Sequence, residues 1–470
     1  MSTPPVPIEN ARVTVVGGAR SGLAAARLLA RRGARVFLTE RGEAENGLTA
    51  SLDAAGVQFE FGGHTARALD ADFVVVSPGV PSTVKPVEQA LRMKTPVFSE
   101  IEVASWFCRG PIVAITGSNG KTTTTSLTAH IVGESGHPMV VAGNIGYPFA
   151  DYVDEVTDET AVVLEVSSFQ LDHIATFRPK VSVLLNVTPD HLDRYDHDFQ
   201  KYAASKFRVF ENQRPGDWLI YNADDEVVAA PVAYAAQRRG FLPYALSIER
   251  PVERGAYVRD GRVILALPAP DASGRIDPQS PMIREEDLMS TSDLALRGRH
   301  NLYNSLAAAI AARAMEIRSD VVRQSLASFE GVPHRLEKVR TVHDVTFIND
   351  SKATNVNAVW YALESFPGNV VLIAGGRDKG NDYGPLKRLV EDKVKGLVAL
   401  GESADKVLAE LGPHAPQTAR AQTMEEAIQY ARLMAEPGDT VLLSPACASF
   451  DMFQNYEDRG DTFKRLVMSL

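Results

Sequence analysis

The stretch that decides the fold is Pro111-Ile-Val-Ala-Ile-Thr-Gly-Ser-Asn-Gly-Lys-Thr-Thr-Thr-Thr125. Residues 111–115 form a short apolar run typical of a buried strand. A glycine-rich turn follows, and residues 122–132 have the pattern of a helix that Gly133 and Gly136 end. At such a turn, backbone N–H groups and the helix dipole bind phosphate, a lysine adds a positive charge, and a threonine hydroxyl can reach Mg²⁺. The stretch therefore predicts a nucleotide-binding loop, although Ile115 stands where the general P-loop has a further glycine.

The same alternation of strand and helix continues on both sides of this stretch. Further buried strands are predicted at 13–16, 35–38, 73–76, 161–164, 181–185, 370–373, 396–400 and 440–443. Helices are predicted at 23–32 and 302–314. This rhythm indicates α/β domains with parallel sheets. Between 250 and 292, where Pro, Asp, Arg and Ser are frequent, neither helical nor strand periodicity is evident, so we expect an irregular surface excursion there. Gly331-Val-Pro333 is predicted to be a hinge.

Composition excludes several classes of protein. The 470 residues correspond to three domains at ~150 residues each, and 45% hydrophobic with 23% charged residues excludes a disordered chain or a coiled-coil rod. The net charge of −10 argues against nucleic acid as a partner, because phosphate backbones are bound by Lys and Arg. Two cysteines, Cys108 and Cys447, make no disulfide scaffold or metal site. With neither a signal-peptide pattern nor a long apolar run, we expect a cytoplasmic protein without a membrane span.

A second glycine-rich turn, Gly17-Gly-Ala-Arg-Ser-Gly22, follows the strand predicted at 13–16. It would match the dinucleotide-binding fingerprint if Ala19 were glycine. The alanine keeps the backbone further from a pyrophosphate than glycine would. From these residues alone, a nicotinamide or flavin cofactor, a plain tight turn and another phosphate-bearing ligand all stay open.

Three more residues are candidates for the edge of the sheet that holds the P-loop. Glu165 ends an apolar strand, where a carboxylate can coordinate Mg²⁺ or simply face solvent. His191 follows the next strand within Asn186-Val-Thr-Pro-Asp-His-Leu-Asp-Arg-Tyr195, although a lone histidine is more often structural. Lys206, within Ala204-Ser-Lys-Phe207, is by itself typical of a solvated helix.

In this order, the segments resemble the Mur ligases, ATP-dependent amide ligases that build the peptide of bacterial cell-wall precursors. Their P-loop also lacks the further glycine. The match narrows to the branch that adds D-glutamate at three C-terminal segments: Pro333-His-Arg-Leu-Glu337, Asn349-Asp-Ser-Lys-Ala-Thr-Asn355 and Ser444-Pro-Ala-Cys-Ala-Ser-Phe-Asp451. The resemblance covers the whole chain and is loosest at 250–292.

The resemblance implies three α/β domains near 1–102, 103–331 and 332–470. The first would be a Rossmann-like UDP-sugar-binding domain, the second a P-loop ATPase-like domain with a mostly parallel sheet, and the third a Rossmann-like amino-acid-binding domain. The implied reaction is ATP-dependent addition of D-glutamate to UDP-N-acetylmuramoyl-L-alanine through an acyl phosphate, in peptidoglycan precursor synthesis. A monomer is expected.

The resemblance also implies the binding residues. Those for ATP would be Gly117, Ser118, Asn119, Gly120, Lys121, Thr122, Thr123, Asn301, Arg335 and Asp350. Those for the UDP-substrate would be Gly17, Ser21, Gly22, Arg41, Ser77, Pro78, Gly79 and Asn144. Those for D-glutamate would be Lys352, Thr354, Lys379, Ser449, Phe450 and Tyr456. The family often has Phe at the position of Tyr456, so no role is expected for its hydroxyl group.

For catalysis, the resemblance implies Lys121, Asn144, Glu165, His191 and Lys206. Thr122 and Glu165 would hold one Mg²⁺, and His191 and Lys206 a second. An ammonium group cannot bind a metal ion, and in the family this lysine is carbamylated by CO₂. The resemblance therefore implies a carbamylated Lys206 in place of a solvated one.

Three alternatives remain from the sequence. Another Mur ligase or a folylpolyglutamate synthase-like ligase would share the centre of the chain, but the Asp-Asn-Pro-Arg segment of the branch that adds a diamino acid is absent. A P-loop NTPase switch or motor would not need a histidine and a lysine beside its Mg²⁺. A nicotinamide-dependent dehydrogenase would use the turn at Gly17 and not the P-loop.

Overall fold

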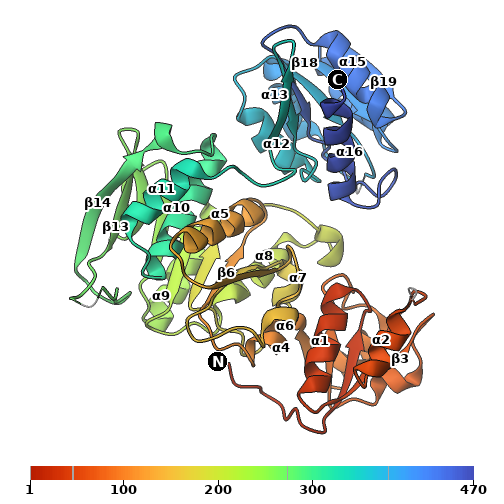
Figure 1. Ribbon diagram of the computed structural model, residues 1–470, viewed down its shortest axis with the longest axis vertical. Coiled ribbons are helices and arrows are strands. Elements are labelled where there is room, and N and C mark those ends of the chain that lie inside the picture. The colour runs from red at the N-terminus through yellow and green to blue at the C-terminus, as the bar shows by residue number, and fades with distance from the viewer. Residues whose placement is uncertain (1, 45–46, 273, 379) are drawn as a thin grey trace. The chain divides into compact units, whose positions relative to one another are not determined.

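The computed structural model describes residues 2–44, 47–272, 274–378 and 380–470 (Figure 1). The chain divides into two compact units, Met1–Leu294 with Leu302–Phe329, and Ala295–Asn301 with Glu330–Leu470. The first unit contains two β-sheets and the second contains one, each covered by helices. The predicted three-sheet α/β architecture is confirmed.

The first sheet has five parallel strands in the order β3-β2-β1-β4-β5. The strands are β1 (Arg12–Val16), β2 (Arg35–Thr39), β3 (Gln58–Glu60), β4 (Phe73–Val76) and β5 (Val97–Ser99). The helices are α1 (Arg20–Arg31), α2 (Leu48–Ala54), the 3₁₀ helix η1 (Ala66–Leu69), α3 (Lys85–Arg92) and α4 (Glu100–Ser105). The strand order reverses between β1 and β4, so the turns that follow these two strands border one crevice, where α/β proteins bind ligands.

The second sheet has nine strands in the order β14-β13-β12-β11-β10-β9-β6-β8-β7. The strands from β7 to β12 pair in parallel: β6 (Ile112–Thr116), β7 (Met139–Gly143), β8 (Ala161–Glu165), β9 (Val181–Leu184), β10 (Trp218–Asn222), β11 (Tyr244–Ser247) and β12 (Gly255–Arg259). The helices are α5 (Lys121–Glu134), α6 (Phe149–Tyr152), α7 (Ser168–Leu171), α8 (Phe199–Phe207), α9 (Glu226–Arg239), α10 (Arg299–Ala314) and α11 (Ser319–Ser328), with 3₁₀ turns η2 (Leu192–Arg194), η3 (Arg208–Phe210) and η4 (Thr291–Asp293). The P-loop turn follows strand β6, as predicted.

The expectation of an irregular excursion at 250–292 is wrong. Here β12 continues the sheet, and β13 (Arg262–Pro268) and β14 (Ile283–Ser290) extend it with antiparallel pairing. Asp260 and Gly261 both have positive φ, at 51° and 71°, and form a tight hairpin turn of the kind favoured by the Asp-Gly dipeptide. The apolar run of β13 is buried. Because the surrounding sequence is rich in Pro and Asp, the hairpin pattern of the Asp-Gly dipeptide and the apolar run was not recognised from the sequence.

The second unit contains a six-stranded sheet in the order β15-β16-β20-β17-β18-β19, in which only the β15–β16 pair is antiparallel. The strands are β15 (Glu337–Val342), β16 (Val345–Asn349), β17 (Val370–Ala374), β18 (Val394–Leu400), β19 (Gln417–Ala421) and β20 (Thr440–Leu443). The helices are α12 (Val356–Glu364), α13 (Lys387–Lys393), α14 (Ala404–Leu411), α15 (Met424–Met434) and α16 (Tyr456–Met468), with 3₁₀ turns η5 (Gly384–Leu386) and η6 (Gly412–His414).

Helix α4 fixes the first sheet to the second. The carboxylate of Glu102 is fully buried and accepts hydrogen bonds from the backbone N–H groups of Ala175, Thr176 and Phe177 and from the indole of Trp106. A buried carboxylate is stable when such donors replace its lost hydration. The two sheets of the first unit are therefore joined through a specific polar contact.

Candidate active site

The P-loop turn is shaped by two glycines with positive φ. Gly117 and Gly120 have φ of 152° and 84°, a region that residues with a Cβ rarely adopt. A Cβ at Gly120 would lie 2.4 Å from Oδ1 of Asn304, so no larger residue fits. Asn186 then holds the turn, because its backbone O accepts from the N–H of Ser118 and its Oδ1 accepts from the N–H of Asn119.

Two lysines meet at the carbonyl oxygen of Gly117. Nζ of Lys121 donates to this oxygen at 2.9 Å, and Nζ of Lys206 donates to it at 2.8 Å. Lys206 extends from α8 and is 2% exposed, with its Nζ 4.7 Å from the ring centroid of Tyr202. Burial and the nearby charge of Lys121 lower the pKa of Lys206 well below its usual value. Lys206 is therefore not the solvated lysine that its sequence context alone suggests.

Thr122, Glu165 and Asn144 form a second cluster beside these lysines. Oγ1 of Thr122 donates to Oε2 of Glu165 at 2.7 Å, and Nδ2 of Asn144 donates to the other carboxylate oxygen at 2.8 Å. Glu165 ends β8 next to β6 and is 2% exposed. Parallel pairing thus brings together residues from three segments of the chain.

His191 lies at the start of η2, with a φ of 52° and a side chain that is 42% exposed. Its ring packs against that of Phe169 with 5.2 Å between centroids. No cluster of three or more His, Cys, Asp or Glu side chains suited to a metal ion occurs among the described residues. Any metal site here would therefore need hydroxyl oxygens, a modified lysine or ligand oxygens in its coordination shell.

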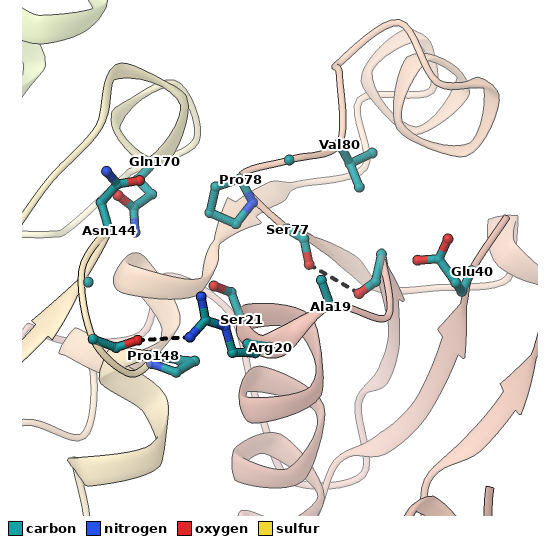
Figure 2. Close-up of a pocket in the computed structure, with 14 residues that line it drawn as sticks. Ala19, Arg20, Ser21, Glu40, Ser77, Pro78, Val80, Asn144, Pro148 and Gln170 are labelled. Carbon is teal, nitrogen blue, oxygen red and sulfur yellow. Dashed lines mark hydrogen bonds between the residues drawn. The ribbon is translucent and has the colours of Figure 1, made fainter. Parts of the chain in front are cut away.

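A cavity of about 330 Å³ opens where the turns after β1 and β4 face the loop after β7 (Figure 2). Figure 2 shows Ser77 and Pro78 on one side and Asn144 and Gln170 on the other. Oγ of Ser77 donates to the carbonyl of Gly17 and joins the two turns of the first sheet. Asn144 therefore contacts both this cavity and the P-loop cluster.

Six of the eight residues expected to bind the UDP-substrate line this cavity: Gly17, Ser21, Ser77, Pro78, Gly79 and Asn144. The other two, Gly22 and Arg41, are not part of its lining. Gly22 lies against the turn instead, since a Cβ there would come within 1.9 Å of the carbonyl oxygen of Gly17. A side chain at position 22 would therefore displace the turn itself.

The cavity also has lining residues that the sequence analysis missed. These include Arg20, Glu40 and Gln170. Glu40 follows β2 directly and accepts from the N–H of Gly18 at 2.5 Å, and three backbone donors hold its pKa below the usual range despite burial. Its place at the carboxyl end of a strand was the available signal. Arg20 donates to the carbonyl of Gly146 across the cavity (Figure 2).

In the second unit, Asp350 directly follows β16 and is buried. Its carboxylate accepts from Oγ of Ser444 at 2.8 Å and from the N–H of Leu336. Burial raises its pKa to about 6, although the charge of Arg335 opposes this shift. Asn301 is also buried, and its Nδ2 donates to the carbonyl of Arg297 at 2.7 Å.

Of the residues expected to bind D-glutamate, four lie on loops that follow β16 and β20, namely Lys352, Thr354, Ser449 and Phe450, and Tyr456 begins α16. Nζ of Lys352 donates to the hydroxyl of Tyr456 at 3.0 Å, Ser449 is buried, and Phe450 is exposed. Thr354 follows Lys352 in the same loop, with its N–H bonded to the carbonyl of Lys352. Lys379 lies outside the described residues.

A residue that the sequence analysis missed joins these loops. The buried Arg459 donates to the hydroxyl and carbonyl of Ser351 and to the carbonyl of Cys447. Arg459 lies near the start of α16, and nothing in its local sequence indicates a partner such as Ser351, which is 108 residues away. Burial lowers its pKa to about 10.

Comparison with known proteins identifies the family. Residues 12–86 match the MurD N-terminal domain, residues 115–312 the Mur ligase middle domain, and residues 334–447 the Mur ligase glutamate ligase domain. The chain belongs to the Mur ligase family. Among similar curated proteins is the UDP-N-acetylmuramoylalanine–D-glutamate ligase of Salinibacter ruber, 60% identical over 99% of both chains. The enzyme of the same name from Chloroherpeton thalassium is 48% identical over 98% of this Mur ligase and 99% of its relative.

Solved structures show that this Mur ligase shares its fold with other members. The UDP-N-acetylmuramate–alanine ligase of Thermotoga maritima superposes with a TM-score of 0.58 at 17% identity, covering 98% of this chain and 99% of that one. The MurF ligase of the same organism, solved in complex with ADP, gives 0.57 at 16% identity over 98% and 96%. Among the described residues, no helix is both long and apolar enough to cross a membrane.

Proposed function

We propose that this Mur ligase joins D-glutamate to UDP-N-acetylmuramoyl-L-alanine with conversion of ATP to ADP and phosphate, in peptidoglycan precursor synthesis. The observation that carries the proposal is the 60% identity, over 99% of both chains, to a relative named for this reaction. The match of residues 12–86 to the MurD N-terminal domain favours this member over the other ligases that share the central domain. The geometry supports it, because Asn144 links the cavity to the P-loop cluster.

In the first step, a carboxylate oxygen of the UDP-substrate attacks the γ-phosphorus of ATP, and ADP leaves. Both reactants are anions, so the protein must neutralise charge and align them. We propose that Lys121 and the amides of residues 117–123 hold the β- and γ-phosphates. The Nζ of Lys121, which contacts the carbonyls of Gly117 and Ser118, would turn toward phosphate oxygens. Asn144 would orient the substrate carboxylate.

In the second step, the uncharged amine of D-glutamate attacks the acyl phosphate. A C–N bond forms, the C–O bond to phosphate breaks, and the amine loses a proton. We propose that Lys352, Thr354, Lys379, Ser449 and Phe450 surround the amino acid. Cations and hydroxyl groups suit its two carboxylates, since charge-assisted hydrogen bonds give both affinity and orientation. Arg335, Asp350 and Asn301 are proposed as further ATP contacts.

The donor set fits Mg²⁺. Oγ1 of Thr122 and Oε2 of Glu165 lie 2.7 Å apart, and neighbouring oxygens in an octahedral Mg²⁺ site are about 3 Å apart at bond lengths of ~2.1 Å. We propose that these two residues hold one ion, and that His191 and a carbamylated Lys206 hold a second. When bound, the ions would supply positive charge to the transferred phosphoryl group.

Carbamylation of Lys206 has two physical supports. CO₂ reacts with an uncharged amine, and burial lowers the pKa of Lys206 so that this form is favoured. The charge of Lys121, whose Nζ shares the Gly117 carbonyl with that of Lys206, would then stabilise the carbamate anion. The carbamate would also provide the oxygen ligand that Mg²⁺ prefers.

The remaining parts of the proposal concern the molecule as a whole. We propose a UDP-substrate domain at 1–102, an ATP domain at 103–331 and an amino-acid domain at 332–470. A monomer in the cytoplasm, where ATP and nucleotide-activated sugars are available, fits the reaction and the two free buried cysteines.

Phosphate release measured with each substrate omitted in turn tests the proposal. We expect phosphate only when ATP, UDP-N-acetylmuramoyl-L-alanine, an amino acid and Mg²⁺ are all present. Lys121→Ala should lower turnover by at least about 100-fold, by analogy with other electrostatic contacts to a transition state, without changing the melting temperature. Phosphate release from ATP alone at the full rate would instead indicate an NTPase switch.

A further inference from the structure

Arg194 connects the central domain to the segment that forms one wall of the cavity. Its guanidinium donates to three consecutive backbone carbonyls, those of Pro78 at 3.4 Å, Gly79 at 3.3 Å and Val80 at 3.1 Å. These three residues line the cavity, whereas Arg194 does not. Arg194 therefore holds this wall without contributing to the lining.

The guanidinium is itself fixed in place. It lies 4.3 Å from the ring centroid of Phe169, next to the lining residue Gln170. The same ring packs against His191, three residues before Arg194. No ion pair between Arg194 and a carboxylate is found in the part of the chain that the structure describes. Its hydrogen bonds are thus made to backbone carbonyls, with its flat face on Phe169.

The direction of these carbonyls matters for an anionic ligand. The C=O and N–H of a trans peptide point in opposite directions. While Arg194 holds the carbonyl of Pro78, the N–H of Gly79 points away from Arg194, and the negative ends of three dipoles are kept on the guanidinium. Without this contact, the carbonyls would be able to turn toward the ligand and repel a diphosphate.

We propose that Arg194 is a positioning residue that orients the Pro78–Val80 segment for the diphosphate of the UDP-substrate, and ties this segment through Phe169 to His191. The inference rests on the proposed function, because it assumes a UDP-linked ligand in the cavity. Arginine is required for this role, since one planar group must serve three acceptors and stack on a ring. The compact ammonium of lysine cannot do both.

Calorimetric titration of UDP-N-acetylmuramoyl-L-alanine into the full-length protein, without ATP or amino acid, tests the inference. We expect Arg194→Lys and Arg194→Met both to weaken binding at least tenfold. In steady-state assays, the KM for this substrate should rise in the same proportion, with the KM for ATP within twofold of the wild-type value.

Arg254→Lys is the matched control. Arg254 also donates to two backbone carbonyls, those of Pro278 and Ser280, and lies over the ring of Tyr244. It precedes β12, which is four strands from β6 in the sheet. The control should bind the UDP-substrate normally.

The outcomes separate the two proposals. A wild-type protein that does not bind the UDP-substrate contradicts the proposed function. Normal binding by the wild type and by both Arg194 variants overturns only the role of Arg194. Weak binding by Arg194→Met but normal binding by Arg194→Lys overturns it as well, because charge alone would then suffice. Melting temperatures near the wild-type value would exclude unfolding as the cause of weak binding.

Discussion

At the scale of single residues, Lys206 has the most demanding chemistry. A buried amine beside Lys121 is electrostatically unfavourable as a cation, and the proposed carbamate would remove this positive charge. We therefore predict that Lys206→Ala and Lys206→Arg are both nearly inactive, because neither provides a carbamate. Acetate added to Lys206→Ala should restore part of the activity by supplying a carboxylate in the vacated space.

Lys201→Arg is the control on the same helix, where Lys201 is half-exposed and pairs with Asp196. It should retain normal turnover. Normal turnover of Lys206→Arg would refute the carbamate, as would the failure of every small carboxylate tested to restore activity to a folded Lys206→Ala protein.

The residues in and around the site show which individual roles could be predicted from the sequence. The P-loop could be predicted because strand, turn and helix are consecutive in the chain. Arg194 and Arg459 could not, since the carbonyls that Arg194 holds and the Ser351 oxygens that Arg459 holds lie more than a hundred residues away in sequence. For the segment after β2, the structure places Glu40, and not Arg41, in the lining. The direction of a side chain beyond a strand end depends on backbone contacts that the sequence pattern does not contain.

At the scale of secondary-structure elements, the start of helix α4 contains a titratable group outside the chemistry. Glu100 is fully buried, its Oε1 accepts from the N–H of Ala150, and its Oε2 has no hydrogen-bond partner among the described residues. Burial raises its pKa from 4.5 to about 7. The folded protein therefore keeps the proton below pH 7, while the unfolded chain releases it above pH 4.5, and stability falls as pH rises through this range.

We predict that Glu100→Gln removes this dependence. The measured quantity is the free energy of unfolding of the variant minus that of the wild type. This difference should be larger at pH 8 than at pH 5 by up to roughly 3 kcal/mol. Chemical denaturation at both pH values measures it. Glu88→Gln, on the exposed side of α3, is the control. For this variant, the difference in free energy of unfolding from the wild type should change between pH 5 and pH 8 by no more than about 0.5 kcal/mol. An equal stability difference at pH 5 and pH 8 would contradict the raised pKa.

The hairpin of β12 and β13, which β14 extends, is the part of the fold that sequence analysis missed. Its strands satisfy local rules, with a buried apolar run and an Asp-Gly turn, but its flanks are rich in Pro, Asp and Ser. The parallel strands around β6 were easier to predict because both of their faces are buried, which produces continuous apolar runs. The pattern of apolar residues therefore predicts a strand well where both faces of the sheet are buried, and poorly for strands near the edge of a sheet.

At the scale of the whole molecule, the order of the motifs along the chain was the basis for predicting the function. No single motif distinguishes a ligase from an NTPase switch, since both use a P-loop. The Gly17 turn and residues 77–79 follow strands of the first sheet, the P-loop follows a strand of the second, and the 349–355 and 444–451 segments border strands of the third. Each sheet thus carries one of the proposed binding regions, as we expect for a reaction of three substrates.

Amino-acid specificity tests the central claim most directly. Purified protein is incubated with ATP, Mg²⁺ and UDP-N-acetylmuramoyl-L-alanine, together with D-glutamate, L-glutamate or diaminopimelate, and the nucleotide product is identified by mass spectrometry. We predict a product that is heavier by one glutamate residue with D-glutamate, formed at least about tenfold faster than any product with the other two. Equal or faster product formation with L-glutamate or diaminopimelate, or no product with D-glutamate, would contradict the account.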